Sequence, residues 1–318
     1  MEENNGGDRE VLWRGAAEPS VALVLLSLFA LVLMGASLGA ALAMTLIPLL
    51  GGDVAVISGG LTADAPAASR WVMRLALGIN HAFSFVAAGF LTVWVYYRKP
   101  TAYSDWRDYL GARQAPDWRA LGRGIALIVC SIPLVLFLYT LNKALPIPDY
   151  LRTMESQTNE AIKGLLIMET PWELIANLTI IALLPAIGEE IVFRGVLQRQ
   201  MQRVIFPAWL AILVSAAIFS AIHLQFEGFL SRWLLGVLLG WLYWQTGNFW
   251  APVAAHFFNN ALQVVGQYLY KSKLSTIDLE QDVQVPWYAA LISLVLVGWI
   301  IQKTHLSNQK RNWLAGRV

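Results

Sequence analysis

The sequence is poor in charged residues for its length. Asp, Glu, Lys and Arg make up only 14% of the 318 residues, whereas about 25% is usual in soluble proteins. Apolar and aromatic residues together with cysteine make up 57% before the 24 glycines are counted, against about 45 to 50% with glycine included in soluble domains. So little charge cannot cover a water-soluble globule of this size, and a membrane is the expected solvent.

Several further absences exclude whole classes of function. The net charge is only +2 and no basic block exceeds two adjacent residues, so no nucleic-acid partner is expected. The single cysteine, Cys130, cannot form an internal disulfide. The chain has neither the H-E-x-x-H motif of zinc proteases nor the G-x-G-D motif of intramembrane aspartyl proteases. The residues that these two mechanisms require are therefore absent.

Long apolar runs predict an all-α fold, a polytopic transmembrane helix bundle of about eight spans. A bilayer core requires roughly 20 apolar residues per helix, and Trp or Tyr at several run ends suits the headgroup level. The predicted spans are Val21 to Leu50, Trp71 to Tyr97, Ala120 to Leu141, Trp172 to Phe193, Trp209 to Leu224, Leu230 to Gln245, Trp250 to Tyr270 and Trp287 to Gln302. The polar stretch from Asp149 to Glu169 permits a short surface helix.

The distribution of Lys and Arg predicts the orientation of the bundle. With the N-terminus in the cytoplasm, 15 of the 23 cations fall in inner segments, six of them between Arg98 and Arg123. Because cytoplasmic loops are enriched in Lys and Arg, both termini are expected in the cytoplasm. A bacterial cytoplasmic membrane is the expected location, and the endoplasmic reticulum membrane is the alternative.

Some motifs in the spans are better explained by packing than by chemistry. Gly35 to Gly39 fits the G-x-S-x-G pattern of hydrolases, but that pattern works only on a strand-to-helix turn. The same glycines read as G-x-x-x-G, as do Gly236 and Gly240, and this spacing lets helices approach closely. Asn80 and His81 are polar residues within the second span, for which we expect interhelical hydrogen bonds.

The fourth span carries two adjacent carboxylates, Glu189 and Glu190. A charge within a membrane helix costs at least roughly 2.5 to 3.5 kcal/mol and therefore needs a partner. Glu190 and Arg194 are four residues apart in the favourable acid-first order and are expected to pair. This pairing leaves Glu189 without an intrahelical cation, which makes Glu189 the reactive candidate. If the glutamates are only counter-charges to Arg194, Glu190 is explained but Glu189 is not.

Two later spans add polar side chains at helical spacing. Phe219 and His223 are four residues apart on the fifth span, and His256 and Asn260 are four apart on the seventh. Peptide hydrolysis needs a base for water and donors for the developing oxyanion. A carboxylate, two imidazoles and an amide can supply both.

The three patterns E-E-x-x-x-R, F-x-x-x-H and H-x-x-x-N, in this order on separate spans, resemble the motifs of the CAAX protease and bacteriocin-processing family, also called ABI proteins or type II CAAX prenyl endopeptidases. The resemblance covers about 90 residues, Trp172 to Gly266. It implies a glutamate-type intramembrane endopeptidase in which Glu189 and His223 activate water. It further implies that His256 and Asn260 bind the oxyanion, with Glu190, Arg194 and Phe219 in support.

A metal site built from the same residues stays open as an alternative, because glutamate and histidine also bind zinc. The zinc ligands would be Glu189, His223 and His256. No cofactor is the first expectation, because the amide of Asn260 is a poor zinc ligand but a good oxyanion donor.

The expected function is hydrolysis of peptide bonds in membrane-associated peptides or proteins, prenylated CAAX-type substrates included, near the cytoplasmic half of the bilayer. The alternatives are a proton-coupled transporter and a non-catalytic immunity or binding protein of the same family. The expected organisation is a cytoplasmic N-terminal tail (residues 1–18), three transmembrane helices with loops (19–171), a catalytic core of four helices (172–270), and a last helix with a cytoplasmic tail (271–318).

Overall fold

The computed structural model describes residues 18–62, 64–113, 115, 118–205, 207–275 and 284–314, with the side chains of residues 58, 59 and 305–314 excepted. The expected N-terminal tail lies outside this description apart from residue 18, as do the last four residues of the expected C-terminal tail. Within the described ranges all regular structure is helical, which confirms the predicted all-α class.

Each of the eight predicted apolar segments coincides with a helix or an unbroken series of helical segments. The series include three π-helical segments, η1 to η3. The elements in chain order are α2 (Val21–Leu49), α4 (Ala67–His81) continued by η1 (Ala82–Ala87) and α5 (Ala88–Tyr97), α7 (Trp118–Lys143), α9 (Pro171–Asn177) continued by η2 (Leu178–Leu183), α10 (Leu184–Glu189), η3 (Glu190–Gln198) and α11 (Arg199–Gln202), then α12 (Ala208–Ala221), α13 (Phe229–Thr246), α14 (Trp250–Lys271) and α15 (Trp287–Leu314).

Three short or amphipathic helices lie in the connections. The predicted surface helix between the third and fourth spans is present as α8 (Asp149–Leu165). The helices α3 (Ala55–Gly59) and α6 (Trp106–Leu110) were not predicted.

The boundaries of four spans differ from the prediction by three residues or more. The second span begins at Ala67 and so also includes Arg70, the fourth continues beyond Phe193 to Gln202, the fifth ends at Ala221 rather than Leu224, and the eighth continues beyond Gln302 to Leu314. Among the described residues, five helical stretches are long and apolar enough to cross a membrane: Val21–Leu49, Ala67–Tyr97, Trp118–Lys143, Pro171–Gln202 and Trp287–Thr304. The count of eight spans stays a prediction, and α12, α13 and α14 are the helices in question.

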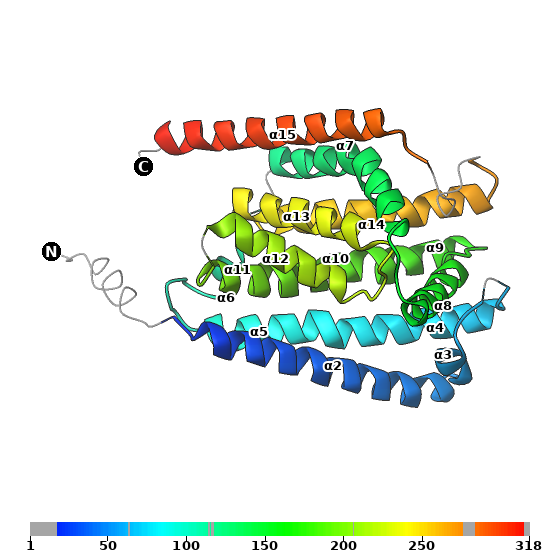
Figure 1. Cartoon of the computed structure of the whole chain (residues 1–318). Coiled ribbons are helices and arrows are strands. Elements are labelled where there is room, and N and C mark those ends of the chain that lie inside the picture. Colours follow the sequence, from blue (N-terminus) through cyan, green and yellow to red (C-terminus); the bar gives the residue numbers. More distant parts are fainter. Residues whose placement is uncertain are drawn as a thin grey trace.

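The helices pack side by side, with α2 on one flank and α15 on the other (Figure 1). The first helix packs against α4 and α5, the last packs against α7, and the long fourth rod lies between these flanks with α13 and α14. The start of α2 and the C-terminal half of α15 lie at the same end of the bundle as α6, whereas α3 and α8 lie at the opposite end (Figure 1).

The predicted small-residue contacts are present. A Cβ atom on Gly35 would lie 2.3 Å from the backbone oxygen of Phe83, and one on Gly39 would lie 2.8 Å from the Cα atom of Asn80. These two glycines therefore allow α2 to lie directly on the backbone of the second span. In addition, Asn80 Nδ2 donates to the carbonyl oxygen of Ala36 at 3.0 Å, which is the expected interhelical hydrogen bond.

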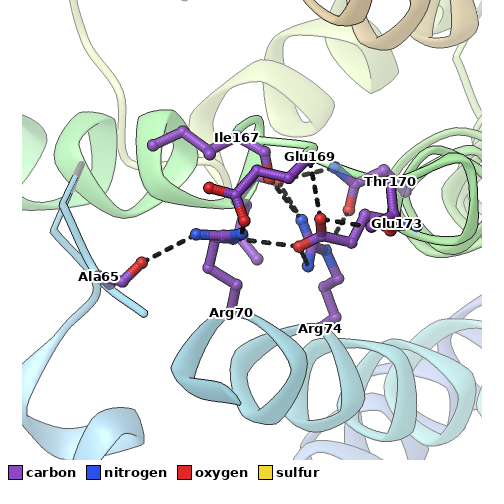
Figure 2. Close-up of polar contacts among 9 residues, drawn as sticks. Ala65, Arg70, Arg74, Ile167, Glu169, Thr170 and Glu173 are labelled. Carbon is purple, nitrogen blue, oxygen red and sulfur yellow. Dashed lines mark hydrogen bonds and ion pairs between the residues drawn. The ribbon is translucent and has the colours of Figure 1, made fainter. Parts of the chain in front are cut away.

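A buried ion-pair network joins the second span to the start of the fourth near the α8 end of the bundle (Figure 2). The fully buried Arg74 donates from Nη1 to Glu173 Oε1 at 2.8 Å, and Arg70 donates from Nε to the same oxygen at 3.1 Å. Arg70 Nη2 also lies 2.6 Å from Glu169 Oε2. Removing one member of such a network leaves an uncompensated buried charge, so the network fixes the relative position of the two rods.

Further hydrogen bonds complete the coordination of Arg74. Its Nε donates to Asn177 Oδ1 at 2.8 Å, and its Nη2 donates to the carbonyl oxygens of Leu165 and Ile167. The end of α8 and the beginning of the fourth rod are thereby tied to α4. The arginines and the glutamates are each spaced four apart in the sequence, but this spacing alone does not show that the two pairs meet.

The predicted orientation can be tested with single cysteines in a Cys130→Ala background. Ser104 lies in the segment before α6 and Ser156 lies on the exposed face of α8, at opposite ends of the bundle. We expect Ser104→Cys to be labelled by an impermeant maleimide only from the cytoplasmic side and Ser156→Cys only from the outer side. Labelling of both positions from one side would contradict the eight-span arrangement, and an inverted pattern would contradict the orientation alone.

Candidate active site

The two adjacent glutamates lie where the fourth rod changes from α-helical to π-helical geometry. Glu189 is the last residue of α10 and Glu190 is the first of η3. Both side chains are buried. π-helical turns are rare and occur frequently at functional sites, which fits this position.

Glu190 connects two other parts of the chain. Its Oε1 atom lies 3.0 Å from Arg194 Nη1, so the expected pair along one helix is present. The same oxygen lies 2.8 Å from Nδ1 of His256 on α14. A buried carboxylate that is ion-paired with an arginine and accepts from a histidine is compensated within the helix and across to a neighbouring one.

Arg194 in turn holds the fifth and sixth helices in place. Its Nη2 donates to the carbonyl oxygen of Gly236 on α13 at 3.1 Å. Its guanidinium lies 4.8 Å from the ring centre of Phe219 on α12, in cation–π geometry. Phe219 also contacts the rings of His223 and His256 edge-on, with centroids 5.0 and 6.0 Å apart. Phe219 is therefore the apolar spacer among the polar candidates.

Glu189 is the carboxylate that faces the cavity. Its Oε2 lies 3.8 Å from His256 Nε2, which is beyond direct hydrogen-bond distance. No hydrogen bond or ion pair joins Glu189 to His223, both of which are described residues. A reacting water would therefore have to connect these two side chains.

His223 lies in a turn two residues beyond the end of α12, not within the fifth helix as predicted. The chain leaves helical geometry here because the next residue, Leu224, has a left-handed φ of 53°. His223 Nδ1 lies 2.8 Å from the carbonyl oxygen of Phe219. A carbonyl only accepts, so Nδ1 carries the proton and Nε2 of the neutral ring is an acceptor.

His256 is also engaged through its Nδ1 atom, but with a carboxylate rather than with a backbone carbonyl. Its Nδ1 lies against the Glu190 carboxylate, which is an acceptor, so Nδ1 carries a proton. Its Nε2 faces Glu189. With Nδ1 protonated, Nε2 accepts in the neutral ring and donates only when the ring carries both protons.

Asn260 lies one helical turn beyond His256 on α14. Its Oδ1 accepts from Asn259 Nδ2 at 3.1 Å, and its own Nδ2 lies 3.4 Å from the carbonyl oxygen of Ile181. These contacts orient the amide with its nitrogen towards the fourth rod. Asn259 was not singled out in the sequence, where it is one of two adjacent asparagines.

All four predicted catalytic side chains line one cavity of about 440 Å³. The wall is mostly apolar and includes Ile162 and Leu166, from α8 and the residue that follows it, and Tyr139 from α7. Because α8 lies opposite α6, the predicted orientation puts this side of the cavity towards the outer side. The expected position of the reaction near the cytoplasmic half of the bilayer stays a prediction, because Glu189 itself lies close to the middle of the rod Pro171–Gln202.

The alternative zinc ligands do not form a three-ligand set in the described residues. Glu189, His223 and His256 share the cavity, but no group of three or more His, Cys, Asp or Glu side chains there has metal-binding geometry. The Nδ1 atoms of His256 and His223 are engaged with Glu190 and with the Phe219 carbonyl, which leaves the Nε2 atom of each ring as the possible ligand atom. Zinc therefore stays the alternative, and chelation tests it.

The loop after His223 is held by α8, a contact that the sequence did not reveal. Glu155 is buried, and its carboxylate accepts from the backbone N–H groups of Phe226 at 2.9 Å and of Glu227 at 3.1 Å. Gln225 Nε2 donates to Asn159 Oδ1 at 2.8 Å. A lone buried glutamate in a polar amphipathic helix gives no sequence signal for such a role.

Two other helices hold the same loop. On α7, Asn142 Nδ2 donates to the Phe226 carbonyl at 2.8 Å and its Oδ1 accepts from the N–H of Leu230. On α13, Arg232 donates to both the side-chain and the carbonyl oxygen of Gln225. The loop that carries His223 is thus fixed from three sides.

A third histidine lies beside the glutamates. His81 stacks on Phe85 with ring centroids 4.7 Å apart. Its buried Nε2 has no hydrogen-bond partner in the described part of the chain, so the expected interhelical bond is not seen for this atom. A Cβ atom on Gly188 would lie 3.2 Å from that nitrogen, so a glycine just before Glu189 lets the second span approach.

A family model described as type II CAAX prenyl endopeptidase Rce1-like matches residues 171–262. This match confirms the resemblance drawn from the three motifs. It contains every candidate catalytic residue and stops short of α15. Together with the apolar helices, it supports an integral membrane protein and, in general terms, an intramembrane protease of the CAAX type.

The chain is also similar to the uncharacterized protein YpbD of Bacillus subtilis (strain 168), with 38% identity over 95 residues. The match spans 28% of this chain and less than half, 44%, of the length of that relative. No solved structure matches.

The Glu190–Arg194 pair should show coupling in a double-mutant cycle. Glu190→Gln and Arg194→Leu should each destabilise the protein in detergent, because each leaves a buried charge unpaired, at a cost of about 3 to 5 kcal/mol. The double variant should recover part of the loss. Recovery should be partial because His256 and Gly236 also lose partners. Thermal unfolding checks this.

The exposed pair Glu160–Lys163, 2.9 Å apart on α8, provides the matched cycle. Its coupling should be within about 0.5 kcal/mol. If the stability losses of Glu190→Gln and Arg194→Leu simply add in the double variant, the coupling energy of the buried pair is as small as that of the surface pair. That result would show that the Glu190–Arg194 pair does not stabilise the site.

Glu155→Ala should loosen the loop that carries His223. It leaves two backbone N–H groups without their acceptor, which costs about 1 to 3 kcal/mol each where they are buried. In hydrogen–deuterium exchange, the amides of Phe226 and Glu227 should exchange faster. Glu160→Ala removes an exposed carboxylate from the same helix and should leave these amides unchanged. Equal protection in both variants would contradict the role of Glu155.

Proposed function

We propose that this protein is a glutamate-type intramembrane endopeptidase that hydrolyses peptide bonds of membrane-associated substrates. The observation that carries the proposal is the convergence of Glu189, His223, His256 and Asn260 on one cavity between apolar helices. The match to the CAAX prenyl endopeptidase model over the same residues supports the reaction class.

In this proposal Glu189 and His223 activate the attacking water. His223 Nε2 is an acceptor, because Nδ1 is committed to the Phe219 carbonyl. Glu189 has no hydrogen-bond partner that would compete for a water, since His256 lies 3.8 Å away. A base within one water of its partner satisfies the geometric requirement for general base catalysis.

His256 and Asn260 are the proposed oxyanion donors. Because Nδ1 of His256 is engaged with Glu190, the role requires a second proton on Nε2, which then donates. The amide of Asn260 is held by contacts with Asn259 and the Ile181 carbonyl. Donors fixed before the reaction in a site with little water stabilise the developing charge without reorganisation.

The cavity wall favours a substrate that approaches from the bilayer. Apolar side chains from the fourth rod, α7 and α8 surround the polar groups. A peptide segment in the membrane, or one carrying a lipid, matches this wall. Prenylated CAAX-type peptides are the first class to test, in line with the description of the matching family model.

The two other candidate functions are less well supported. A proton relay in a transporter would need polar groups that continue to both ends of the bundle. A non-catalytic binding protein would not need His223 Nε2 to be left as a free acceptor inside the cavity. Restoration of a deletion phenotype by an inactive Glu189 variant would favour the binding function.

The proposal predicts distinct effects of three substitutions on proteolysis. Glu189→Ala and His223→Ala should each abolish cleavage, because base and partner act as a unit. Asn260→Ala should retain some activity, reduced by about 10² to 10³, since one oxyanion donor is lost. The measurement is mass spectrometry of membrane peptides released by the purified protein in liposomes, with a prenylated peptide added as a defined substrate.

Glu160→Ala, an exposed glutamate on α8, is the control and should cleave like the wild type. A chelator should leave activity unchanged, whereas loss with chelator and recovery with zinc would support the metal alternative. Near-normal turnover by Glu189→Ala would refute the assignment.

A further inference from the structure

A second hollow lies between α7 and α15, away from the proposed active site. It has a volume of about 490 Å³ and is lined by residues from the first turns of α7 and from the middle of α15. Helix α7 also contributes to the cavity of the proposed active site, through residues further along the helix, whereas α15 does not. Neither helix lies within the residues that match the family model. The hollow therefore needs an explanation of its own.

Three cations line this hollow, and none of the described residues that line it is acidic. They are Arg119 and Arg123 on α7 and Lys303 on α15. Arg119 and Lys303 are exposed, and Arg123 is half-buried. These cations come from two helices that face each other, so an anion between the helices can be bound from both sides.

The rest of the wall is apolar. Ala126 and Ile300 form part of it, and Ile300 belongs to the buried cluster that holds α7 against α15. Trp299, 56% exposed, lies beside Lys303, whose Nζ is 5.9 Å from the indole ring. The hollow thus has a cationic part and an apolar part, which suits an amphiphile better than a free ion.

The position of the hollow along the bundle fits the headgroup level. Trp118, the first residue of α7, is 83% exposed, and tryptophan is enriched at membrane interfaces. The hollow lies at the end of the bundle that contains α6, where the excess of Lys and Arg is predicted to face the cytoplasm (Figure 1). Basic pockets between transmembrane helices on that side bind anionic lipid headgroups.

We propose that this hollow is a binding site for an anionic phospholipid. Its phosphate lies between Arg123 on α7 and Lys303 on α15, and an acyl chain runs along Ala126, Trp299 and Ile300. The lipid thereby bridges α7 and α15 through its phosphate. This site is independent of the proposed peptidase activity.

The full-length protein in detergent, titrated with dioleoyl phosphatidylglycerol and followed by native mass spectrometry, tests the site. Wild type should retain this lipid in preference to dioleoyl phosphatidylcholine. The double variant Arg123→Gln/Lys303→Gln should bind phosphatidylglycerol on the order of thirtyfold more weakly, since each cation near an anionic surface contributes roughly a factor of five.

The matched control is Arg98→Gln/Lys99→Gln, which removes the same charge from exposed positions next to α5, at the same end of the bundle but outside the hollow. It should bind as the wild type does. Arg123→Lys/Lys303→Arg keeps the charge and should also retain the lipid, which separates loss of binding from loss of folding.

Three results would overturn the proposal. Equal loss in the hollow variant and in the control would show a diffuse charge effect. Unchanged binding in the hollow variant would show that the lipid binds elsewhere. Inorganic phosphate that competes as well as the lipid, at the same concentration, would show a phosphate site without a lipid requirement.

Discussion

A carboxylate buried in a membrane-spanning helix must be compensated by groups from other parts of the chain, and Glu190 recruits two of them. Arg194 reaches it along the same rod, and His256 reaches it from α14. Arg194 then extends the connection to α13 through the Gly236 carbonyl. The cost of burying one charge thereby fixes the helices that carry the reactive side chains, and Glu189 is left free to face the cavity.

The same constraint acts at the α8 end of the bundle. Arg74 and Glu173 are buried together, and the arginine also binds carbonyl groups at the end of α8 (Figure 2). Helix α8 in turn presents Glu155 to the loop after His223. A chain of buried polar contacts therefore runs from the second span through α8 to His223. A perturbation at α8 would reach the site through these hydrogen bonds as well as through the apolar side chains of α8 that line the cavity.

Much of the fold and of the candidate site follows from local sequence. Apolar length predicts the helices, because each must match a bilayer core, and fixed spacing predicts the Glu190–Arg194 pair and the contacts of Gly35 and Gly39. The second span was predicted to begin four residues too late, because Arg70 ends the hydropathy run although its charge is neutralised by Glu169 and Glu173. The pairing of His256 with Glu190, and the role of Glu155, depend on how distant helices meet. Spacing along one helix carries no information on either.

The position of the cavity sets a condition on how a substrate would enter. Ile162 and Leu166, from α8 and the residue after it, and Gly228, from the loop after His223, form the wall of the cavity at the α8 end. A substrate would therefore pass beside α8 or enter laterally from the bilayer. With the Arg98 to Arg123 segment in the cytoplasm, the α8 end is the outer side. If the orientation is inverted, the same cavity serves cytoplasmic peptides, and the lipid site at the opposite end meets the outer leaflet. One property, the side on which α8 lies, thus decides both the source of substrates and the leaflet that supplies the lipid.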